Sequence, residues 1–252
     1  MLELKNIHFS YNKEPFIDDL NIKISNGEMV SVLGPNGSGK STVVKILTGE
    51  MKPGHGTVHL EGSDIHSIPI RELAQRLSVM TQNAGINFPY TCLEVVQMGL
   101  YPHKDLGVGI DSKEVEEIFE LMEKTETHEF AEKLITEVSG GEAQRVLLTR
   151  ILAQNTPVIV LDEAFSAMDV AHRVDMLRIM KKQVQRKNKS VIAVMHDLNM
   201  AYLFSDRVIL MKSGNVFAEG LTDEVMTPDN LYHVFGIRVT KIDGKGFLIE
   251  TN

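Results

Sequence analysis

The residues most suited to chemistry form the stretch Gly34–Thr42, with the sequence Gly-Pro-Asn-Gly-Ser-Gly-Lys-Ser-Thr. The apolar run Met29–Leu33 before it predicts a buried strand, and Val43–Leu47 after it predicts the first turns of a helix. Strand, Gly-x-x-x-x-Gly-Lys-Ser and helix is the pattern of a phosphate-binding loop, in which glycines let backbone N–H groups point inward. Lys40 can reach the β- and γ-phosphates and Ser41 can ligate Mg²⁺. The pattern therefore predicts a nucleoside triphosphate site.

Two adjacent carboxylates, Asp162 and Glu163, follow the apolar run Val158–Leu161. The carboxyl ends of buried strands are where α/β proteins hold their ligands. Asp162 is suited to hold Mg²⁺, and Glu163 can polarise an attacking water. Taken alone, such a pair could equally be a helix cap or a surface turn. Downstream of a phosphate-binding loop, the catalytic interpretation is favoured.

Two further polar positions could act on the same phosphates, and a third segment could form another anion site. Gln82 and His196 each follow an apolar strand, so both are expected at the sheet edge that holds the nucleotide. Gln82 could touch Mg²⁺ or the attacking water, and His196 could contact the γ-phosphate. Ser139-Gly140-Gly141-Glu142 opens another helix with a capping hydroxyl, which is a second potential anion site. The alternatives are a structural histidine and a plain helix cap.

The elements that must position these residues alternate between strands and helices, which predicts an α/β fold with a mainly parallel sheet. We expect an antiparallel β subdomain near the N-terminus, and an all-helical insertion at 84–155 in a core of residues 1–83 and 156–252. The whole chain, 1–252, would be a single discontinuous domain. The expected strands are 2–9, 16–24, 29–33, 57–60, 77–81, 158–161, 190–195, 206–211 and 216–218. The expected helices are 71–76, 93–100, 113–125, 142–153 and 170–187.

Composition restricts the class of protein. The formal net charge of −8 argues against a general nucleic-acid binder, which would usually be basic. The single cysteine, Cys92, excludes an internal disulfide and suits a reducing compartment. The sequence contains no apolar run of about 18 residues, and its first residues have a strand pattern rather than that of a signal peptide. We therefore expect a cytosolic protein that could still dock on a membrane protein.

Together these motifs resemble the nucleotide-binding subunits of ATP-binding cassette (ABC) transporters over nearly the whole chain. Val138–Glu142 is similar to the family's Leu-Ser-Gly-Gly-Gln signature, with Val for Leu and Glu for Gln. Ala164 stands where the family usually has proline. The resemblance implies an α/β P-loop NTPase core that binds ATP and Mg²⁺.

The resemblance also implies a role for each site residue. Lys40, Glu163 and His196 would be catalytic, with Glu163 as the base and His196 as the switch histidine. Gln82 in the Q-loop, Asp162 in Walker B and Ser41 would serve the metal. Asp169 would form the D-loop, and Tyr11 would stack on adenine. The nucleotide-binding set is Tyr11, Gly34, Pro35, Asn36, Gly37, Ser38, Gly39, Lys40, Ser41 and Thr42. The signature set, acting on the partner's ATP, is Ser139, Gly140, Gly141 and Glu142.

In this family two subunits, here expected to be identical, pack head-to-tail around ATP and drive a polytopic membrane permease at the cytoplasmic face. A substrate-binding protein would take part indirectly, and no nucleic acid is expected. The resemblance is to importers of iron chelates, haem and cobalamin, and most of all to haem (hemin) importer subunits, so haem or a siderophore is the expected cargo. The segments that carry this resemblance are Leu47–Glu50, Asn87–Thr91, Glu94–Val96, Gly99–His103, Val170–His172, His196–Ala201 and Thr227–Gly236. The alternatives are a cobalamin importer, a soluble ABC ATPase that is not coupled to transport, and a P-loop kinase or GTPase, which would leave Ser139–Gly141 without a purpose.

Overall fold

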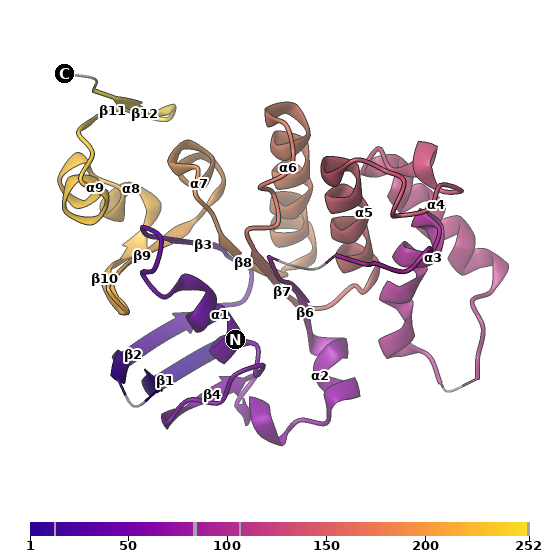
Figure 1. Cartoon of the computed structure of the whole chain (residues 1–252), viewed down its shortest axis with the longest axis horizontal. Coiled ribbons are helices and arrows are strands. Elements are labelled where there is room, and N and C mark those ends of the chain that lie inside the picture. The colour runs from indigo at the N-terminus through magenta and orange to yellow at the C-terminus, as the bar shows by residue number, and fades with distance from the viewer. Residues whose placement is uncertain (13, 83–84, 106, 251–252) are drawn as a thin grey trace. The chain divides into compact units, whose positions relative to one another are not determined.

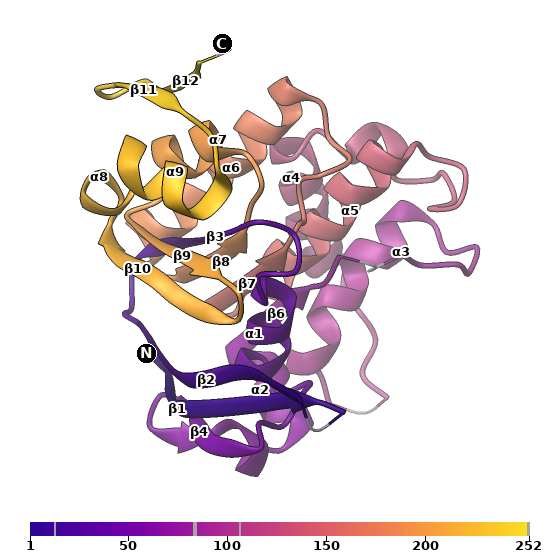
Figure 2. The same ribbon diagram turned by 60° about the vertical axis from the view of Figure 1, so that its left-hand side comes forward.

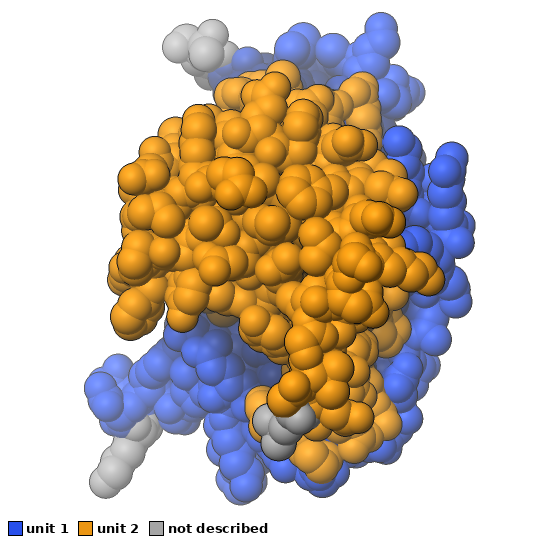
Figure 3. Space-filling model, turned by 90° about the vertical axis from the view of Figure 1, so that its right-hand side faces the viewer, with its two compact units in different colours: residues 1–68, 181–252 blue, residues 69–180 orange. Residues whose placement is uncertain are grey.

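The computed structural model describes residues 1–12, 14–82, 85–105 and 107–250. The chain forms two compact units (Figure 3), one of residues 1–68 with 181–252 and one of residues 69–180. The chain passes from the second unit to the first within helix α6, Val170–Lys187. Among the described residues, no helix has the length and apolar character needed to span a bilayer.

The N-terminal part of the first unit is an antiparallel sheet, as predicted (Figure 2). Its strands are β1 (Leu2–Tyr11), β2 (Glu14–Ile24), β4 (His55–Leu60) and β5 (Ser63–Asp64), in the order β2-β1-β4-β5. The inward residues of β1 and β2, among them Leu4 and Ile22, are buried and lie opposite one another. Alternating burial along a strand is what a sheet with one apolar face requires.

The remaining long strands of the first unit form a second, mixed sheet with the order β10-β9-β3-β8. They are β3 (Met29–Leu33), β8 (Ser190–Val194), β9 (Arg207–Lys212) and β10 (Asn215–Leu221). β3 pairs in parallel with both β8 and β9, while β10 is antiparallel to β9. Every residue of β3 and β8 is buried. This explains why the two strands have continuous apolar runs, since a parallel sheet is covered on both faces.

Short helices follow the strands of the first unit (Figure 1). They are α1 (Lys40–Leu47), η1 (Ile65–Ser67), α7 (Leu198–Phe204), α8 (Thr222–Val225) and α9 (Pro228–Phe235). Helix α7 packs against β3, and α8 and α9 pack against β9. Asp197 caps α7 and Thr227 caps α9 by accepting backbone N–H groups, so each helix begins at a residue type that favours helix starts.

The C-terminal hairpin of the first unit, β11 (Val239–Ile242) with β12 (Gly246–Ile249), was not among the predicted elements. Its signal was present, because Asp243-Gly244 between apolar residues is a strong hairpin turn sequence. Asn199 of α7 holds the hairpin through both amide atoms. Its Oδ1 accepts the Phe247 N–H at 2.7 Å, and its Nδ2 donates to the Phe247 carbonyl at 3.2 Å.

Asn199→Ala should loosen this hairpin locally. Two hydrogen bonds at about 0.5–1.5 kcal/mol each would lower the free energy of local opening by about 1–3 kcal/mol. Hydrogen exchange of the Phe247 amide measures that free energy directly. Asn215→Ala is the matched control, because Asn215 Nδ2 donates only to the exposed turn carbonyl of Ser213 and should leave Phe247 exchange unchanged.

The second unit is mainly helical, with two parallel strands. It contains α2 (Ile70–Arg76), β6 (Leu77–Met80), α3 (Cys92–Gln97), η2 (Met98–His103), α4 (Ser112–Lys124), η3 (His128–Phe130), α5 (Gly140–Ala153), β7 (Val158–Asp162) and the start of α6. β6 and β7 pair in parallel. Among the described residues of 85–153, every named element is a helix. Helix α5 packs against α3 and α4, and its inner face, with Val146 and Leu148, is fully buried.

The expected helices and strands are present, with small changes at their ends. The helix expected at 93–100 is α3 followed by the 3-10 helix η2. The strand expected at 216–218 is β10, which is longer, at Asn215–Leu221. The limits of the helical insertion, 84–155, remain a prediction, and the first of them lies outside the described residues.

Candidate functional site

The phosphate-binding loop turns sharply between β3 and α1. Gly37 and Gly39 have φ angles of 76° and 102°, in the left-handed region that glycine adopts without strain. Gly34 passes so close to β9 that a Cβ there would lie 2.4 Å from the Met211 carbonyl oxygen. The N–H of Ser38 reaches back to the Pro35 carbonyl at 3.2 Å. The loop is therefore tightly curled at the N-terminus of α1, the arrangement expected of an anion site.

Two buried polar side chains lie inside this loop. Lys40 donates from Nζ to the carbonyl oxygens of Gly34 and Pro35, at 2.9 and 3.0 Å. Ser38 is almost fully buried, and its Oγ has no hydrogen-bond partner among the described residues. A buried hydroxyl without a partner costs free energy unless a ligand supplies one. The donor set of the loop, with its positive Lys40, fits phosphate oxygens.

Tyr11 lies at the end of β1, beside α1. Its hydroxyl is 2.9 Å from Oγ1 of Thr42, and its ring meets the edge of Phe9 and tilts against Phe16. The side chain is nevertheless 45% exposed, so a ring face can still receive a planar base. Its predicted role in adenine stacking remains a prediction.

His196 and the phosphate-binding loop lie at the same sheet edge. Val32 of β3 pairs in register with Val194 of β8. Gly34, where the phosphate-binding loop begins, lies two residues after Val32, and His196 lies two residues after Val194. The His196 side chain is exposed and lines a 400 Å³ hollow together with α7 and the C-terminal hairpin. The parallel register thus brings together, within one unit, two of the predicted groups.

The second unit brings Gln82 and the carboxylate pair together in the same manner. Met80 of β6 is the register partner of Leu161 of β7. Gln82 Nε2 donates to Glu163 Oε2 at 2.7 Å. Asp162, the last residue of β7, is 3% exposed. Glu163 has a φ of 54°, which is uncommon for a residue with a side chain. This left-handed backbone turn directly follows the last residue of β7.

The residues predicted to hold Mg²⁺ offer a hydroxyl, an amide and a carboxylate. These are the hard oxygen donors that Mg²⁺ prefers. The hydrogen bond from Gln82 uses its amide nitrogen, so it does not consume the oxygen that would face a metal. Among the residues that the structure describes, no three His, Cys, Asp or Glu side chains cluster as a metal site of their own. These donor types are compatible with Mg²⁺.

The predicted signature begins helix α5 with a complete capping box. Ser139 Oγ accepts the Glu142 N–H at 3.4 Å, and Glu142 Oε2 accepts the Ser139 N–H at 2.7 Å. The side-chain hydroxyl and then the backbone N–H of Ser139 hold the pKa of the Glu142 carboxyl below its usual value of 4.5. The Glu form of the signature thus keeps the local geometry, because glutamate and glutamine both close such a box.

Glu142→Gln should make stability less dependent on pH. The folded-state pKa of Glu142 is depressed, so its contribution is fully present above about pH 4.5 and is lost as the pH falls through the folded-state value. The parent should be slightly more stable than the variant at pH 7, and this difference should shrink to nothing in strong acid. Chemical denaturation of both proteins at a series of pH values tests this, and a constant difference would contradict it.

Gln144 connects the signature helix to the segment after Glu163. Its Oε1 accepts the Ala167 N–H at 2.9 Å, and its Nε2 lies 3.4 Å from Ser166 Oγ. Signature and D-loop residues line one 390 Å³ hollow: Ser139, Gly141, Glu142, Arg145, Ala167, Met168, Asp169 and His172. The role of Gln144 was not predicted. The available signal was its position one helical turn after Gly140, on the same face of α5.

The comparisons with known proteins agree with this geometry. The ABC transporter family model matches residues 17–166, more than half of the chain. The chain is 36% identical over 88% of its length to a cobalamin import ATP-binding protein of Halobacterium salinarum, of which it spans 56%. It is 34% identical over 96% of its length to a hemin import ATP-binding protein of Vibrio parahaemolyticus, covering 94% of that protein. A ferric enterobactin transport ATP-binding protein of Escherichia coli is 32% identical, with 92% of this chain and 86% of that protein covered.

Solved structures give the same result. A chain of an ABC transporter described as metal-chelate type, in an inward-facing conformation, has a TM-score of 0.82 at 25% identity, with 99% of this chain and 97% of that chain covered. The dimeric bacterial ABC transporter cassette MJ0796 has a TM-score of 0.79 at 29% identity, with coverages of 88% and 99%. The predicted α/β fold is thus confirmed, and the chain belongs to the ABC transporter family as one of its ATP-binding subunits.

Proposed function

We propose that this chain hydrolyses ATP to power an importer of iron chelates, haem or cobalamin. One observation carries the proposal: the chain builds two separate helix N-termini suited to phosphate. One follows Gly34–Gly39, and the other is capped by Ser139. A kinase or GTPase needs only the first. In the family's head-to-tail dimer, each ATP lies between one subunit's phosphate-binding loop and its partner's signature, so both sites are used.

The chemistry proposed is attack of water on the γ-phosphate. Glu163 would accept the proton of the attacking water, and Gln82, which donates to its carboxylate, would help to orient that group. Lys40 would neutralise phosphate charge, and His196 would hold the γ-phosphate. Phosphoryl transfer depends mostly on such positioning and charge neutralisation, so the chain needs no covalent intermediate.

Magnesium is part of the proposal. When bound, Mg²⁺ would supply positive charge that offsets the negative charge developing on the phosphates. Ser41, Gln82 and Asp162 would hold it. Asp162 is 3% exposed at the end of β7, and its carboxylate is the kind of hard oxygen donor that Mg²⁺ prefers.

The proposed membrane partner is a polytopic permease, with the chain at the cytoplasmic face of the membrane. Exposed aromatic side chains in the segment after the Q-loop support a docking surface of this kind. Phe88 is 69% exposed and Tyr101 is 58% exposed. Aromatic residues are enriched in protein–protein interfaces relative to the rest of a protein surface. The dimeric cassette among the similar structures supports a second, identical subunit as the other partner.

For the cargo we propose haem or a siderophore, with cobalamin as the alternative. The similar ATP-binding proteins are named for cobalamin, hemin and ferric enterobactin import. The cargo would pass through the permease and not touch this chain. Identification of the cargo therefore needs the assembled complex.

The test is to purify the tagged chain from gently solubilised native membranes and to identify what co-purifies by mass spectrometry. A polytopic membrane protein at about one copy per chain would support the importer. An absorbance scan of the complex and its binding protein then separates haem from siderophore. A chain that hydrolyses ATP but recovers no membrane partner would instead be a soluble ABC ATPase.

A further inference from the structure

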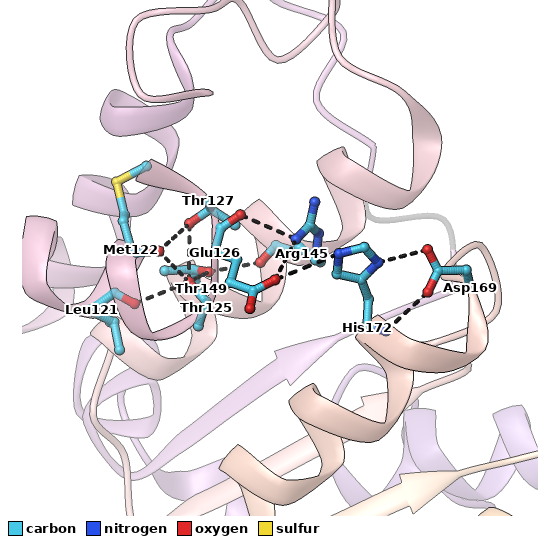
Figure 4. Close-up of polar contacts among 9 residues, drawn as sticks. All are labelled: Leu121, Met122, Thr125, Glu126, Thr127, Arg145, Thr149, Asp169 and His172. Carbon is cyan, nitrogen blue, oxygen red and sulfur yellow. Dashed lines mark hydrogen bonds and ion pairs between the residues drawn. The ribbon is translucent and has the colours of Figure 1, made fainter. Parts of the chain in front are cut away.

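A side-chain network in the second unit joins the signature helix to the start of α6 (Figure 4). It runs from Arg145 of α5 through Glu126, in the turn after α4, to His172 and then to Asp169. None of Arg145, Glu126 and His172 has a part in the chemistry proposed above. What the network could do follows from its geometry.

His172 occupies both oxygens of the Asp169 carboxylate. Its backbone N–H donates to Oδ1 at 3.0 Å, and its ring Nδ1 lies 2.7 Å from Oδ2. Because an ionised carboxylate only accepts, Nδ1 carries the proton. The backbone bond first, and the side-chain bond second, hold the pKa of Asp169 below its ordinary value, so the carboxylate is charged at neutral pH. The predicted D-loop residue is thus oriented by one neighbour.

Glu126 holds the other side of the His172 ring. Its Oε2 lies 3.7 Å from His172 Nε2 and 3.8 Å from Arg145 Nη1. Arg145 also donates from Nη1 to the Glu126 carbonyl at 3.2 Å, is almost buried, and lies over the Phe130 ring. Figure 4 shows dashed lines from the Glu126 carboxylate to both the guanidinium and the imidazole.

The turn that carries Glu126 is rigidly built. Glu126 has a φ of 53°, and the residues on either side of it bear buried hydroxyls. Thr149 of α5 donates to Thr125 Oγ1 at 2.8 Å, and Thr125 Oγ1 lies 3.0 Å from Thr127 Oγ1. Buried hydroxyls that satisfy one another specify a single arrangement. These hydrogen bonds therefore fix the position of the Glu126 turn relative to the signature helix α5.

A contribution to folding stability does not explain the contacts among Asp169, Glu126 and His172. The side chains of Asp169, Glu126 and His172 are 64%, 65% and 36% exposed, and ion pairs between exposed groups contribute little to folding. Their geometry instead couples two segments that line the same 390 Å³ hollow, the signature at Ser139 and the D-loop at Asp169.

We propose that His172 is a positioning residue for ATP hydrolysis, anchored by Glu126, that fixes the D-loop carboxylate of Asp169 relative to the signature helix. The inference rests on the proposed function, because the surface formed by Asp169 and the signature helix, which His172 would hold in place, would meet the partner's nucleotide. Misplacement of that surface slows the chemical step without weakening nucleotide binding to the chain's own phosphate loop, which lies on different residues.

The test uses two amides that each mimic one ring nitrogen. The amide of His172→Asn can replace Nδ1 and keep the bond to Asp169, whereas that of His172→Gln extends toward the Nε2 position. We expect His172→Gln to lower kcat about tenfold to a hundredfold with KM for ATP nearly unchanged, and His172→Asn to recover most of the activity. Glu126→Gln should lower kcat in the same way, and the double variant His172→Gln with Glu126→Gln should be no slower than the slower single variant.

Controls separate this inference from the proposed function. His233→Gln removes an exposed histidine of α9 whose ring hydrogen-bonds to the Asp229 carbonyl and stacks on Phe217, outside the proposed site, and should keep full activity. If the parent chain hydrolyses ATP but His172→Gln matches its kcat, the inference is wrong and the proposed function stands. If His172→Asn is as slow as His172→Gln, the Asp169 bond does not carry the effect and the inference is overturned. A parent without ATPase activity would overturn both. Equal melting temperatures of the variants would show that kcat, not folding, has changed.

Discussion

Glu163→Gln should slow ATP hydrolysis by about 10²–10⁴-fold, the usual worth of a general base. The substitution removes the proton acceptor but keeps a side-chain oxygen. That oxygen can still accept the hydrogen bond that Gln82 Nε2 donates to Glu163 Oε2 at 2.7 Å in the parent chain. The loop after β7 should therefore keep its shape, and ATP binding should persist. Because hydrolysis would no longer separate the subunits, the variant should form dimers when Mg-ATP is added.

Phosphate release gives the rate, and light scattering gives the oligomeric state. The matched control is Glu120→Gln, the same chemical change at an exposed residue of α4 that forms a surface ion pair with Lys124 at 3.4 Å, which should retain activity within about twofold. Monomers of Glu163→Gln at saturating Mg-ATP would contradict the proposed dimer mechanism. Normal turnover would show that Glu163 is not the base.

Lys40→Met should abolish most ATP-dependent stabilisation and slow hydrolysis by about 10²–10³-fold, as expected when one charged donor to a reacting phosphate is lost. Lys40 is buried, and its ammonium already lies within the loop, at 2.9 Å from the Gly34 carbonyl. Methionine keeps most of the volume and removes the charge. The parent chain should gain about 2.7 kcal/mol of stability at ATP concentrations 100-fold above Kd, and the variant much less.

Thermal unfolding with and without Mg-ATP measures this effect. Lys45→Met is the control, because Lys45 lies on the same helix but is partly exposed and makes only a surface ion pair with Glu50 at 3.6 Å. Such a pair contributes little, so both stability and ATP response should remain close to the parent values. Equal ATP-dependent shifts in the two variants would show that Lys40 does not contact the phosphates.

Local sequence was sufficient to predict a feature when a single short segment contains all the interactions that define that feature. The phosphate-binding loop needs a strand, glycines at fixed spacing and a helix start, and Gly37 and Gly39 do adopt left-handed angles. The capping box at the predicted signature needs a hydroxyl and, three residues later, a carboxylate or an amide, and Ser139 with Glu142 forms it. Buried parallel strands were recognisable because both of their faces are covered.

Contacts between distant segments could not be predicted in this way. The Gln82 bond to Glu163 joins residues 81 positions apart, and it depends on the register of β6 with β7. Asn199 binds Phe247, 48 positions away, through backbone atoms that any residue would present. No residue type marks such a partner in advance.

The sequence by itself determined the fold class, the chemistry of the phosphate loop and the family, because each is encoded in short patterns whose spacing the backbone enforces. Only the tertiary structure decided which side chains act together. Glu126 lies in the turn after α4 and His172 lies in α6, and only tertiary packing brings Glu126 Oε2 to 3.7 Å from His172 Nε2. Interactions of this range fall steeply with distance, so their partners become known only when the packing is known.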